Sequence, residues 1–254
     1  MKDFSLLVTG DEQLSGKRQD KHLGKVIELL AARGLSLSSA SYVGDGEARI
    51  ADAISAAVRR AEILLCTGGI GATPDDNTRQ AAARAFGVPI ERHREAEALI
   101  VRQYPDKAFP HRVLMADFPR GAGLIPNPVN QVAGFFLGDC NFVPGFPEMA
   151  WPMLEWVLDQ RYPHLHRSDP PVEFRLRAQG TTAEGDLLPL MRLLLKEFPG
   201  VTLSSLPFRG DAQRPRHIEF GIKGSREQAA AAYLWFRAQL LRQPELNLED
   251  LAAP

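Results

Sequence analysis

Cysteine is scarce in this chain of 254 residues, which contains only Cys66 and Cys140. Both lie in apolar runs, so we expect buried free thiols, which excludes a disulfide framework and argues against a cysteine-based zinc site. No apolar stretch reaches the ~20 residues of a membrane span. The short apolar run behind Met1 and Asp3 does not form a signal peptide. We therefore expect a cytoplasmic protein without a membrane partner.

An excess of charge of either sign is also lacking. Lys and Arg number 30 against 31 Asp and Glu, which gives a net charge of -1. General binders of nucleic acid or of membrane surfaces need a large basic excess, so this balance argues against both functions. A local basic loop with Arg209, Arg214 and Arg216 leaves RNA contact through the second half of the chain as an alternative.

The first half alternates apolar runs with amphipathic stripes. We expect strands at 4–8, 35–43 and 63–66, and helices marked by 23–30, 50–61 and 78–86. This order predicts an α/β fold with a mostly parallel sheet and helices on both faces. A helix over 91–104, irregular short strands over 112–143 and a helix over 148–159 follow.

A second, smaller domain is expected after a Pro-, His- and Ser-rich linker at 162–171. Its strands are expected at 172–178, 201–206 and 218–222, and its helices at 187–198 and 230–241. This β-α-β-β-α order predicts a small α+β domain. The domain boundaries are set at 1–163 and 172–242, and the tail from residue 243 is expected to be loosely held.

The strongest local signal is the segment 67–78, TGGIGATPDDNT, between a buried strand and a helix. Its glycines allow a sharp bend and let a ligand approach main-chain N–H groups closely. Those groups and the helix N-terminus that follows suit a phosphate. The alternative is a tight turn with a capped helix, and the candidates for the cap are Asp75, Asp76 and Asn77.

Two more strand ends carry acids. The segment 9–20, TGDEQLSGKRQD, places Asp11 and Glu12 where they could hold Mg²⁺, and it is not a P-loop because Arg18 stands where Ser or Thr is needed. Asp45 follows the next strand. Each of these acids is alternatively an ordinary solvated turn residue.

Convergence favours the functional interpretation. In a parallel sheet the loops after the first three strands open at one edge, so acids for a metal would face main-chain N–H groups for a phosphate across one cleft. That is the arrangement that phosphoryl or nucleotidyl chemistry requires. The residues concerned are Asp11, Glu12, Asp45, Asp75, Asp76, Gly68, Gly69 and Gly71.

These motifs resemble the molybdopterin-binding domain family of MoaB and MogA proteins, and most closely the N-terminal domain of the CinA (competence/damage-inducible) family. The family's GDE-x-x-SG-x-x-x-D is matched from Gly10 to Asp20, and its TGG-x-G-x-T-x-DD-x-T from Thr67 to Thr78. Pro144-Gly145-Phe146-Pro147-Glu148 nearly matches a later PG-x-P-x-E. The similarity covers about residues 4–160.

The resemblance implies a three-layer α/β/α domain that binds a pterin phosphate or a dinucleotide, and a homo-oligomer. It also implies one of two activities, a metal-dependent pyrophosphatase acting on ADP-ribose or FAD, or an adenylyltransferase acting on molybdopterin. Carried over, the catalytic residues are Asp11, Asp45 and Asp76, and the ligands of Mg²⁺ or a similar divalent cation are Asp11, Glu12, Asp45 and Asp76. The ligand- and phosphate-binding residues are Gly10, Gly68, Gly69, Gly71, Thr73, Asp75, Thr78, Pro144 and Gly145.

The chain departs from the family pattern at several positions. Lys21-His22 replaces Thr-Asn, Ala72 replaces a proline, Gly46 replaces an acid, and the segment 127–135 lacks a glycine and a proline. These changes would alter the pocket. A protein that binds a pterin or nucleotide without reacting is therefore the alternative to an enzyme.

Overall fold

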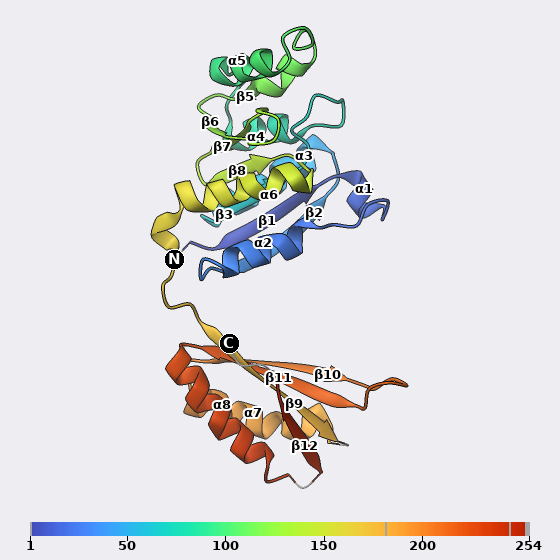
Figure 1. Ribbon diagram of the computed structural model, residues 1–254, viewed down its shortest axis with the longest axis vertical. Helices are drawn as coiled ribbons and strands as arrows, with labels where there is room; N and C mark the ends of the chain where they lie inside the picture. The colour runs from blue at the N-terminus through green and yellow to red at the C-terminus, as the bar shows by residue number, and fades with distance from the viewer. Residues whose placement is uncertain (1, 181, 244, 252–254) are drawn as a thin grey trace. The chain divides into compact units, whose positions relative to one another are not determined.

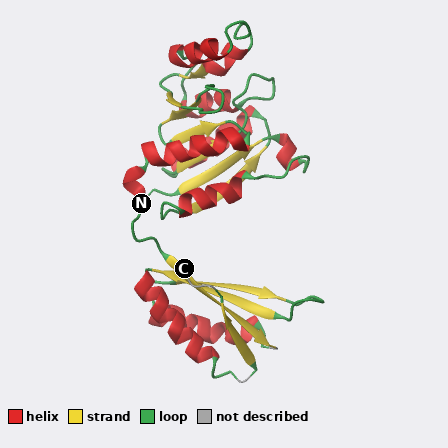
Figure 2. Ribbon diagram, in the orientation of Figure 1, coloured by secondary structure: helices red, strands yellow, loops and turns green. Residues whose placement is uncertain are grey.

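The computed structural model describes residues 2–180, 182–243 and 245–251. The chain divides into two compact units, Met1–Arg167 and Ser168–Pro254. Figure 1 shows the path of the chain through each unit, and Figure 2 shows which segments are helix, strand or loop. The boundary lies within the segment predicted to be a linker.

The first unit is built on a six-stranded sheet in the order β2-β1-β3-β8-β7-β6. β2, β1, β3 and β8 are parallel neighbours, whereas β7 is reversed and pairs antiparallel with both β8 and the edge strand β6. The predicted, mostly parallel sheet is therefore confirmed. The bounds are β1 (Phe4–Thr9), β2 (Leu37–Val43), β3 (Ile63–Thr67), β6 (Gly123–Ile125), β7 (Gly134–Leu137) and β8 (Cys140–Val143).

Helices cover both faces of this sheet (Figure 1). Because successive side chains of a strand point to opposite faces, Leu6 and Val8 of β1 pack with α2 (His22–Ala31) and α6 (Pro147–Trp156). Leu7 packs on the other side with α3 (Glu47–Arg59) and α4 (Thr78–Phe86). The result is the expected three-layer α/β/α domain.

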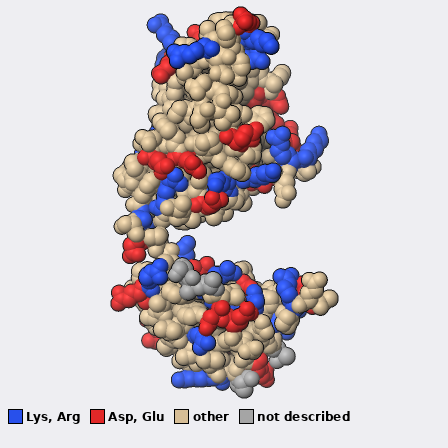
Figure 3. All heavy atoms as spheres, in the orientation of Figure 1, with Lys and Arg blue, Asp and Glu red and all other residues tan. Residues whose placement is uncertain are grey.

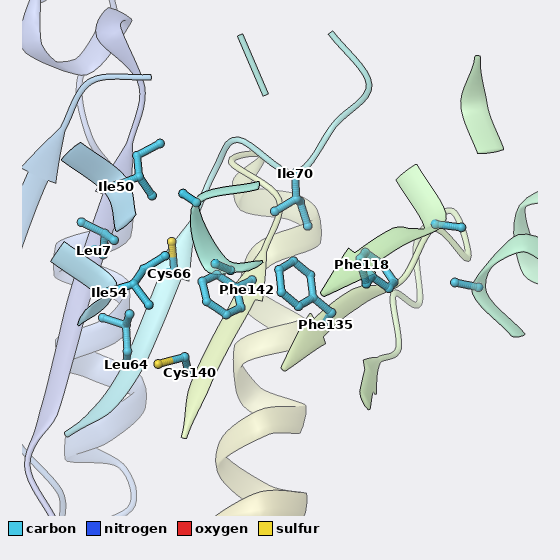
Figure 4. Packing of buried hydrophobic residues seen from close by; sticks show 14 of the residues in the cluster. Leu7, Ile50, Ile54, Leu64, Cys66, Ile70, Phe118, Phe135, Cys140 and Phe142 are labelled. Atoms are coloured by element: carbon cyan, nitrogen blue, oxygen red, sulfur yellow. The ribbon is translucent and has the colours of Figure 1, made fainter. Parts of the chain in front are cut away.

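An aromatic stack fills the core on the α3 and α4 side (Figure 4). The ring centroids of Phe118 and Phe135 lie 4.8 Å apart, and those of Phe135 and Phe142 lie 4.5 Å apart. Cys66 and Cys140 are buried in the same cluster as free thiols, as predicted. Burial raises the pKa of the Cys140 thiol to about 12, so it is protonated and unreactive at neutral pH.

The segment after α4 differs in part from the prediction. The helix expected over 91–104 begins later, as α5 (Arg94–Gln103), because β4 (Ile90–Arg92) pairs antiparallel with β5 (Asp117–Pro119). Asp117 accepts a hydrogen bond from Arg92 and fixes this pairing. A 3-10 turn, η1 (Arg112–Ala116), leads into β5. α6 runs into a short π-helical segment, Val157–Arg161, and a 3-10 turn, Pro163–Leu165, follows.

The second unit is an antiparallel sheet in the order β10-β11-β9-β12, with α7 and α8 packed on one face. The predicted β-α-β-β-α order is confirmed and one strand is added, which gives the order of ferredoxin-like domains. The bounds are β9 (Val172–Gly180), α7 (Leu188–Glu197), β10 (Thr202–Phe208), β11 (His217–Gly224), α8 (Arg226–Leu240) and β12 (Leu246–Asp250), with a 3-10 turn, Glu184–Leu187, before α7.

The tail was expected to be loosely held from residue 243, and this is wrong for 246–250. β12 pairs with β9, and Leu246 and Leu248 pack against the core of the second unit. The Asp250 carboxylate accepts hydrogen bonds from Tyr233 and from Arg237 at 2.8 Å. The strand therefore closes the edge of the sheet at β9.

Figure 3 shows acidic and basic side chains in small separate groups on the visible face of each unit, with uncharged surface between them. Neither sign gathers into a large patch there. The exposed face of the second sheet pairs its charges internally, because Arg177 donates to Glu219 and Glu249, each at 2.8 Å. No helix among the described residues is long and apolar enough to span a membrane.

Candidate functional site

A cavity of about 410 Å³ opens at the carboxyl ends of β1 and β3. This is where an open parallel sheet is expected to bind ligands, and the volume lies within the ~300–1,000 Å³ of small-molecule sites. Asp11 and Thr78 do not line it. The predicted site residues that do line it are Gly10, Glu12, Asp45, Gly68, Gly69, Gly71, Thr73, Asp75, Asp76, Pro144 and Gly145.

The glycine loop is held in a conformation that only glycine adopts without strain. Gly68 and Gly69 have φ angles of 99° and 67°. A Cβ on Gly68 would lie 2.6 Å from the Thr9 carbonyl oxygen, and one on Gly69 would lie 2.2 Å from Thr78 Oγ1. The loop is anchored because the Gly68 N–H donates to Val143 and the Thr78 N–H donates to Gly69.

Several main-chain donors of this loop are left for a ligand. Within the described residues, the N–H groups of Gly69, Ile70 and Gly71 have no acceptor. Ile70 is buried, and Gly69 and Gly71 are half-buried. Thr67 Oγ1 lies on the same cavity wall and is also buried without a partner. A concave row of such donors is a site for an anion.

Of the acids that follow β1 and β2, Glu12 and Asp45 line the cavity and Asp11 does not. The Asp11 N–H donates to Asp45 Oδ2 at 3.0 Å, and the Asp45 N–H donates to Asp11 Oδ1 at 3.3 Å. This reciprocal pair joins α1 (Asp11–Leu14) to the loop after β2. Glu12 folds over Gly10, where a Cβ would lie 2.5 Å from Glu12 Oε2. Glu12 and Asp45 therefore reach the cavity, whereas Asp11 supports it from outside.

Asp76 shapes the far end of the glycine loop. Its Oδ2 accepts hydrogen bonds from the Thr73 N–H at 2.9 Å and from the Thr73 hydroxyl at 2.5 Å. Thr78 is fully buried, and its hydroxyl lies 3.5 Å from that of Thr9. Thr78 thus fixes the loop against β1 instead of lining the cavity.

The electrostatics of the cavity favour a cation beside a phosphate. Burial raises the pKa of Asp45, as do the nearby carboxylates Asp11, Glu12 and Asp75, against a smaller lowering by the Asp11 N–H. Crowded carboxylates are oxygen ligands suited to a hard divalent cation. Among the described residues no three His, Cys, Asp or Glu side chains are grouped to hold a metal by themselves. Glu12 and Asp45 each bring one carboxylate to the cavity lining.

His22, one of the positions where the sequence departs from the family pattern, lies in the cavity wall. It is 2% exposed, and its Nε2 lies 3.2 Å from the Gly145 carbonyl oxygen. Burial lowers the pKa of His22, so the ring is neutral at pH 7. Because a carbonyl only accepts, Nε2 carries the proton and Nδ1 is an acceptor, buried and without a partner in the described residues.

The sequence motifs did not point to Arg79, because it lies one residue after the segment 67–78. Its guanidinium is buried beneath the glycine loop, donating to the carbonyl oxygens of Gly71 and Leu114. Burial lowers its pKa, and Asp76 and Asp117 offset this in part. A buried cation under a loop of N–H donors adds to the positive potential at the cavity floor. A charged residue at the second position of an alanine-rich helix was the available signal.

Arg79→Lys is expected to weaken binding of inorganic pyrophosphate ~10-fold, because a compact ammonium does not bridge two carbonyls as the planar guanidinium does. Isothermal titration calorimetry measures the affinity. Arg84→Lys is the matched control on the same helix, where Arg84 is exposed and lies 3.7 Å from Glu47. Unchanged pyrophosphate affinity in a folded Arg79→Lys protein would refute this role.

Comparison with known proteins shows which family the chain matches. Residues 5–165 match the family described as "Probable molybdopterin binding domain". A CinA-like protein of Syntrophotalea carbinolica is 32% identical over 171 residues, covering 65% of this chain and 41% of that protein. A protein of Pyrobaculum aerophilum is 29% identical over 260 residues, covering 98% of this chain and 96% of the relative. The chain thus spans about two fifths of the CinA-like relative.

A solved structure supports the same assignment. The structure titled as the protein CinA with unknown function from Thermoplasma acidophilum superposes with a TM-score of 0.58 at 25% identity, covering 62% of this chain and 98% of that one. The family match at residues 5–165 lies within the first unit, which carries the cavity, the glycine loop and the acids. The chain therefore belongs to the family of molybdopterin-binding domains, close to the CinA-like proteins within it.

Proposed function

We propose that the cavity at the glycine loop binds the phosphates of a pterin or nucleotide. The chain would cleave a phosphoanhydride bond there, or transfer a group from it, with the help of a divalent cation. One observation supports the proposal: within the described residues, unpartnered main-chain N–H donors of the glycine loop and the carboxylates of Glu12 and Asp45 line a single cavity. A metal-assisted reaction of a phosphate needs hydrogen-bond donors for the phosphate oxygens and oxygen ligands for the metal ion.

In this proposal the glycine loop binds the phosphates and stabilises their negative charge. The N–H groups of Gly69, Ile70 and Gly71, with the Thr67 hydroxyl, would donate to phosphate oxygens. Their positions are fixed before the ligand arrives, because the loop is anchored to Val143 and Thr78. Preorganised donors of this kind stabilise negative charge as it develops, and removing one typically costs on the order of 10²–10³ in rate.

Glu12 and Asp45 would hold the cation, together with oxygens of the bound phosphates. When bound, the ion would supply Lewis-acid stabilisation of the phosphate charge. Asp11 would act through Asp45, because each accepts a hydrogen bond from the main chain of the other. In hydrolysis, a water oxygen attacks one phosphorus, the bridging P–O bond breaks, and the bridging oxygen leaves on the second phosphate.

The test is an assay of the full chain with ADP-ribose, FAD, or molybdopterin plus ATP, each with Mg²⁺ or Co²⁺. We expect cation-dependent turnover of at least one substrate, with AMP released from the first two or adenylylated molybdopterin formed from the third. Removing the cation with a chelator should abolish the product, and restoring it should recover the rate. A correctly folded sample that converts none of these substrates would count decisively against the enzyme.

A second candidate is a protein that binds the same ligand without reacting. It is favoured by the hydrogen bonds that already occupy the acids, since Asp11 and Asp45 bond each other's main chain and Asp76 bonds Thr73. Such a protein should show a thermal shift with ligand that is unchanged in Asp45→Asn and needs no cation. A shift that depends on Mg²⁺ favours the enzyme instead.

A further inference from the structure

Helix α8 carries two apolar stripes on opposite sides. The inner stripe packs against the sheet of the second unit and consists of Ala229, Ala232, Phe236 and Leu240. The outer stripe repeats at intervals of three and four residues and consists of Ala231, Leu234, Ala238 and Leu241. All four outer residues are exposed, Leu234 by 66% and Leu241 by 56%. A surface helix normally carries charged and polar residues on this side, so the outer stripe indicates a face that another protein surface covers.

The neighbouring helix adds to the same apolar layer. α7 lies beside α8 on one face of the sheet (Figure 1), and Leu188, Leu193 and Leu195 of α7 are exposed. The opposite face of the sheet is different in character, because Arg177 forms ion pairs there with Glu219 and Glu249. The helical layer is therefore the side of the second unit that offers apolar surface to a partner.

The order of residue sizes in the outer stripe fits a second copy of α8 that runs antiparallel. In a symmetric antiparallel pair centred at the level of residue 236, Leu234 of one copy lies opposite Ala238 of the other. Leu241 lies opposite Ala231 in the same way. Each large side chain then meets a small one, so the layers interdigitate. A parallel pair would set leucine against leucine and alanine against alanine, which alternates crowding with gaps.

Charges at the two ends of the outer stripe favour the same arrangement. Glu227 continues the stripe at the beginning of α8, and Arg242 follows Leu241 at its end. Neither side chain forms an ion pair within the part of the chain that the structure describes. The antiparallel pair brings Arg242 within about one helical turn of Glu227 of the second copy, at both ends of the contact. A parallel pair would place Glu227 beside Glu227.

We propose that the outer stripe of α8 binds a second copy of this chain, in a two-fold symmetric dimer whose α8 helices pack antiparallel. The contact lies on the second unit, outside the residues 5–165 that match the family, and it is independent of the proposed phosphate site. A contact made by one helix and the leucines beside it is smaller than a standard interface of ~1,600 Å². We therefore expect a reversible dimer with a Kd on the order of 10 μM.

Sedimentation equilibrium of the full chain tests the pairing. The average mass should rise from that of the monomer toward twice that value as the concentration passes through the micromolar range. Leu234→Lys should raise the Kd at least ~10-fold, because its ammonium would be buried in the apolar layer opposite Ala238. Leu206→Lys is the matched control, since Leu206 is 61% exposed and pairs with Glu219 on the open face of the sheet. It should leave the Kd unchanged.

Disulfide trapping tests the direction of the helices. Cys66 and Cys140 are buried in the first unit, so a cysteine introduced on α8 supplies the accessible thiol. On mild oxidation, a mixture of Leu234→Cys and Ala238→Cys chains, one of them tagged, should form mixed dimers in preference to either homodimer. A mixture of Leu234→Cys and Ala231→Cys should not, because these positions lie about two turns apart in the antiparallel pair.

Three results would overturn the proposal. The first is a full chain that stays monomeric at every concentration. The second is self-association that Leu234→Lys leaves unchanged in folded protein, because the chain would then pair through another surface. The third is cross-linking of Leu234→Cys chains to one another in preference to Ala238→Cys chains, which would show a parallel pair.

Discussion

Gly68→Ala is expected to reduce pyrophosphate affinity on the order of 100-fold, the equivalent of about two hydrogen bonds to a charged group. The added Cβ would lie 2.6 Å from the Thr9 carbonyl oxygen and 2.7 Å from Thr9 Oγ1. The first of these neighbours is main chain in the central strand and does not rotate away. The loop must therefore move, and its N–H donors move with it. Calorimetric titration of the full chain measures the loss.

The matched control is Gly87→Ala. Gly87 also has a left-handed backbone, with φ of 65°, but an added Cβ would meet no atom within 4 Å. It closes the other end of α4, away from the cavity. We expect a stability cost of about 1 kcal/mol from the backbone conformation and unchanged affinity for pyrophosphate. Gly68→Ala binding as well as Gly87→Ala, in folded protein, would contradict the role given to the loop.

Asp45→Asn is expected to lower cation-dependent turnover by on the order of 10²–10³ and, at the same time, to make the first unit more stable at pH 7. The amide retains an oxygen to accept the Asp11 N–H, so the local fold is kept. It loses the charge that would help hold the cation. Turnover is measured with ADP-ribose and Mg²⁺, and stability by thermal unfolding.

The stability gain follows from the direction of the pKa shift. Burial raises the pKa of Asp45, so between its ordinary and its raised value the folded state binds more protons than the unfolded state. The free energy of unfolding therefore falls as pH rises through that window, and at pH 7 the whole cost is present. Asn removes this cost, and we expect a higher Tm than that of the wild type at pH 7, with a difference that shrinks toward zero in the acid range.

Asp52→Asn is the control, since Asp52 is an exposed acid on the helix that follows Asp45. It should leave turnover and Tm unchanged. Trp235→Phe in both backgrounds confines tryptophan fluorescence to the first unit, because Trp151 and Trp156 both lie there. Asp45→Asn with wild-type turnover would remove this carboxylate from the chemistry, and a lower Tm would show that its charge stabilises the fold.

Strong periodicity made much of the fold predictable. The helix predicted over 78–86 is α4 to the residue, because an alanine-rich stripe begins after the motif and Gly87 adopts the left-handed conformation that ends a helix. β4 and β12 were missed for the opposite reason. β4 has only three residues, and β12 has only two apolar residues, Leu246 and Leu248, so neither forms a continuous apolar run like those of β1 and β3.

The sequence predicted which loops form the site. It did not predict the role of each side chain in it. Parallel topology alone brings the ends of β1, β2 and β3 together, so the cleft followed from the order of elements. The turning of Asp11 away from the cavity, the burial of His22 and the position of Arg79 under the loop depend on packing between distant segments. Such contacts leave no periodic trace in one sequence.

The two buried thiols give the first unit a reporter of its own opening. Cys66 and Cys140 lie on adjacent strands in the centre of the sheet, and the second unit contains no cysteine. A thiol-reactive dye in solution therefore labels the chain only when that sheet comes apart, and the labelling rate counts those openings. A ligand that binds at the carboxyl ends of the strands should lower the labelling rate in proportion to its occupancy. The labelling rate of the two thiols would therefore report ligand binding to the first unit.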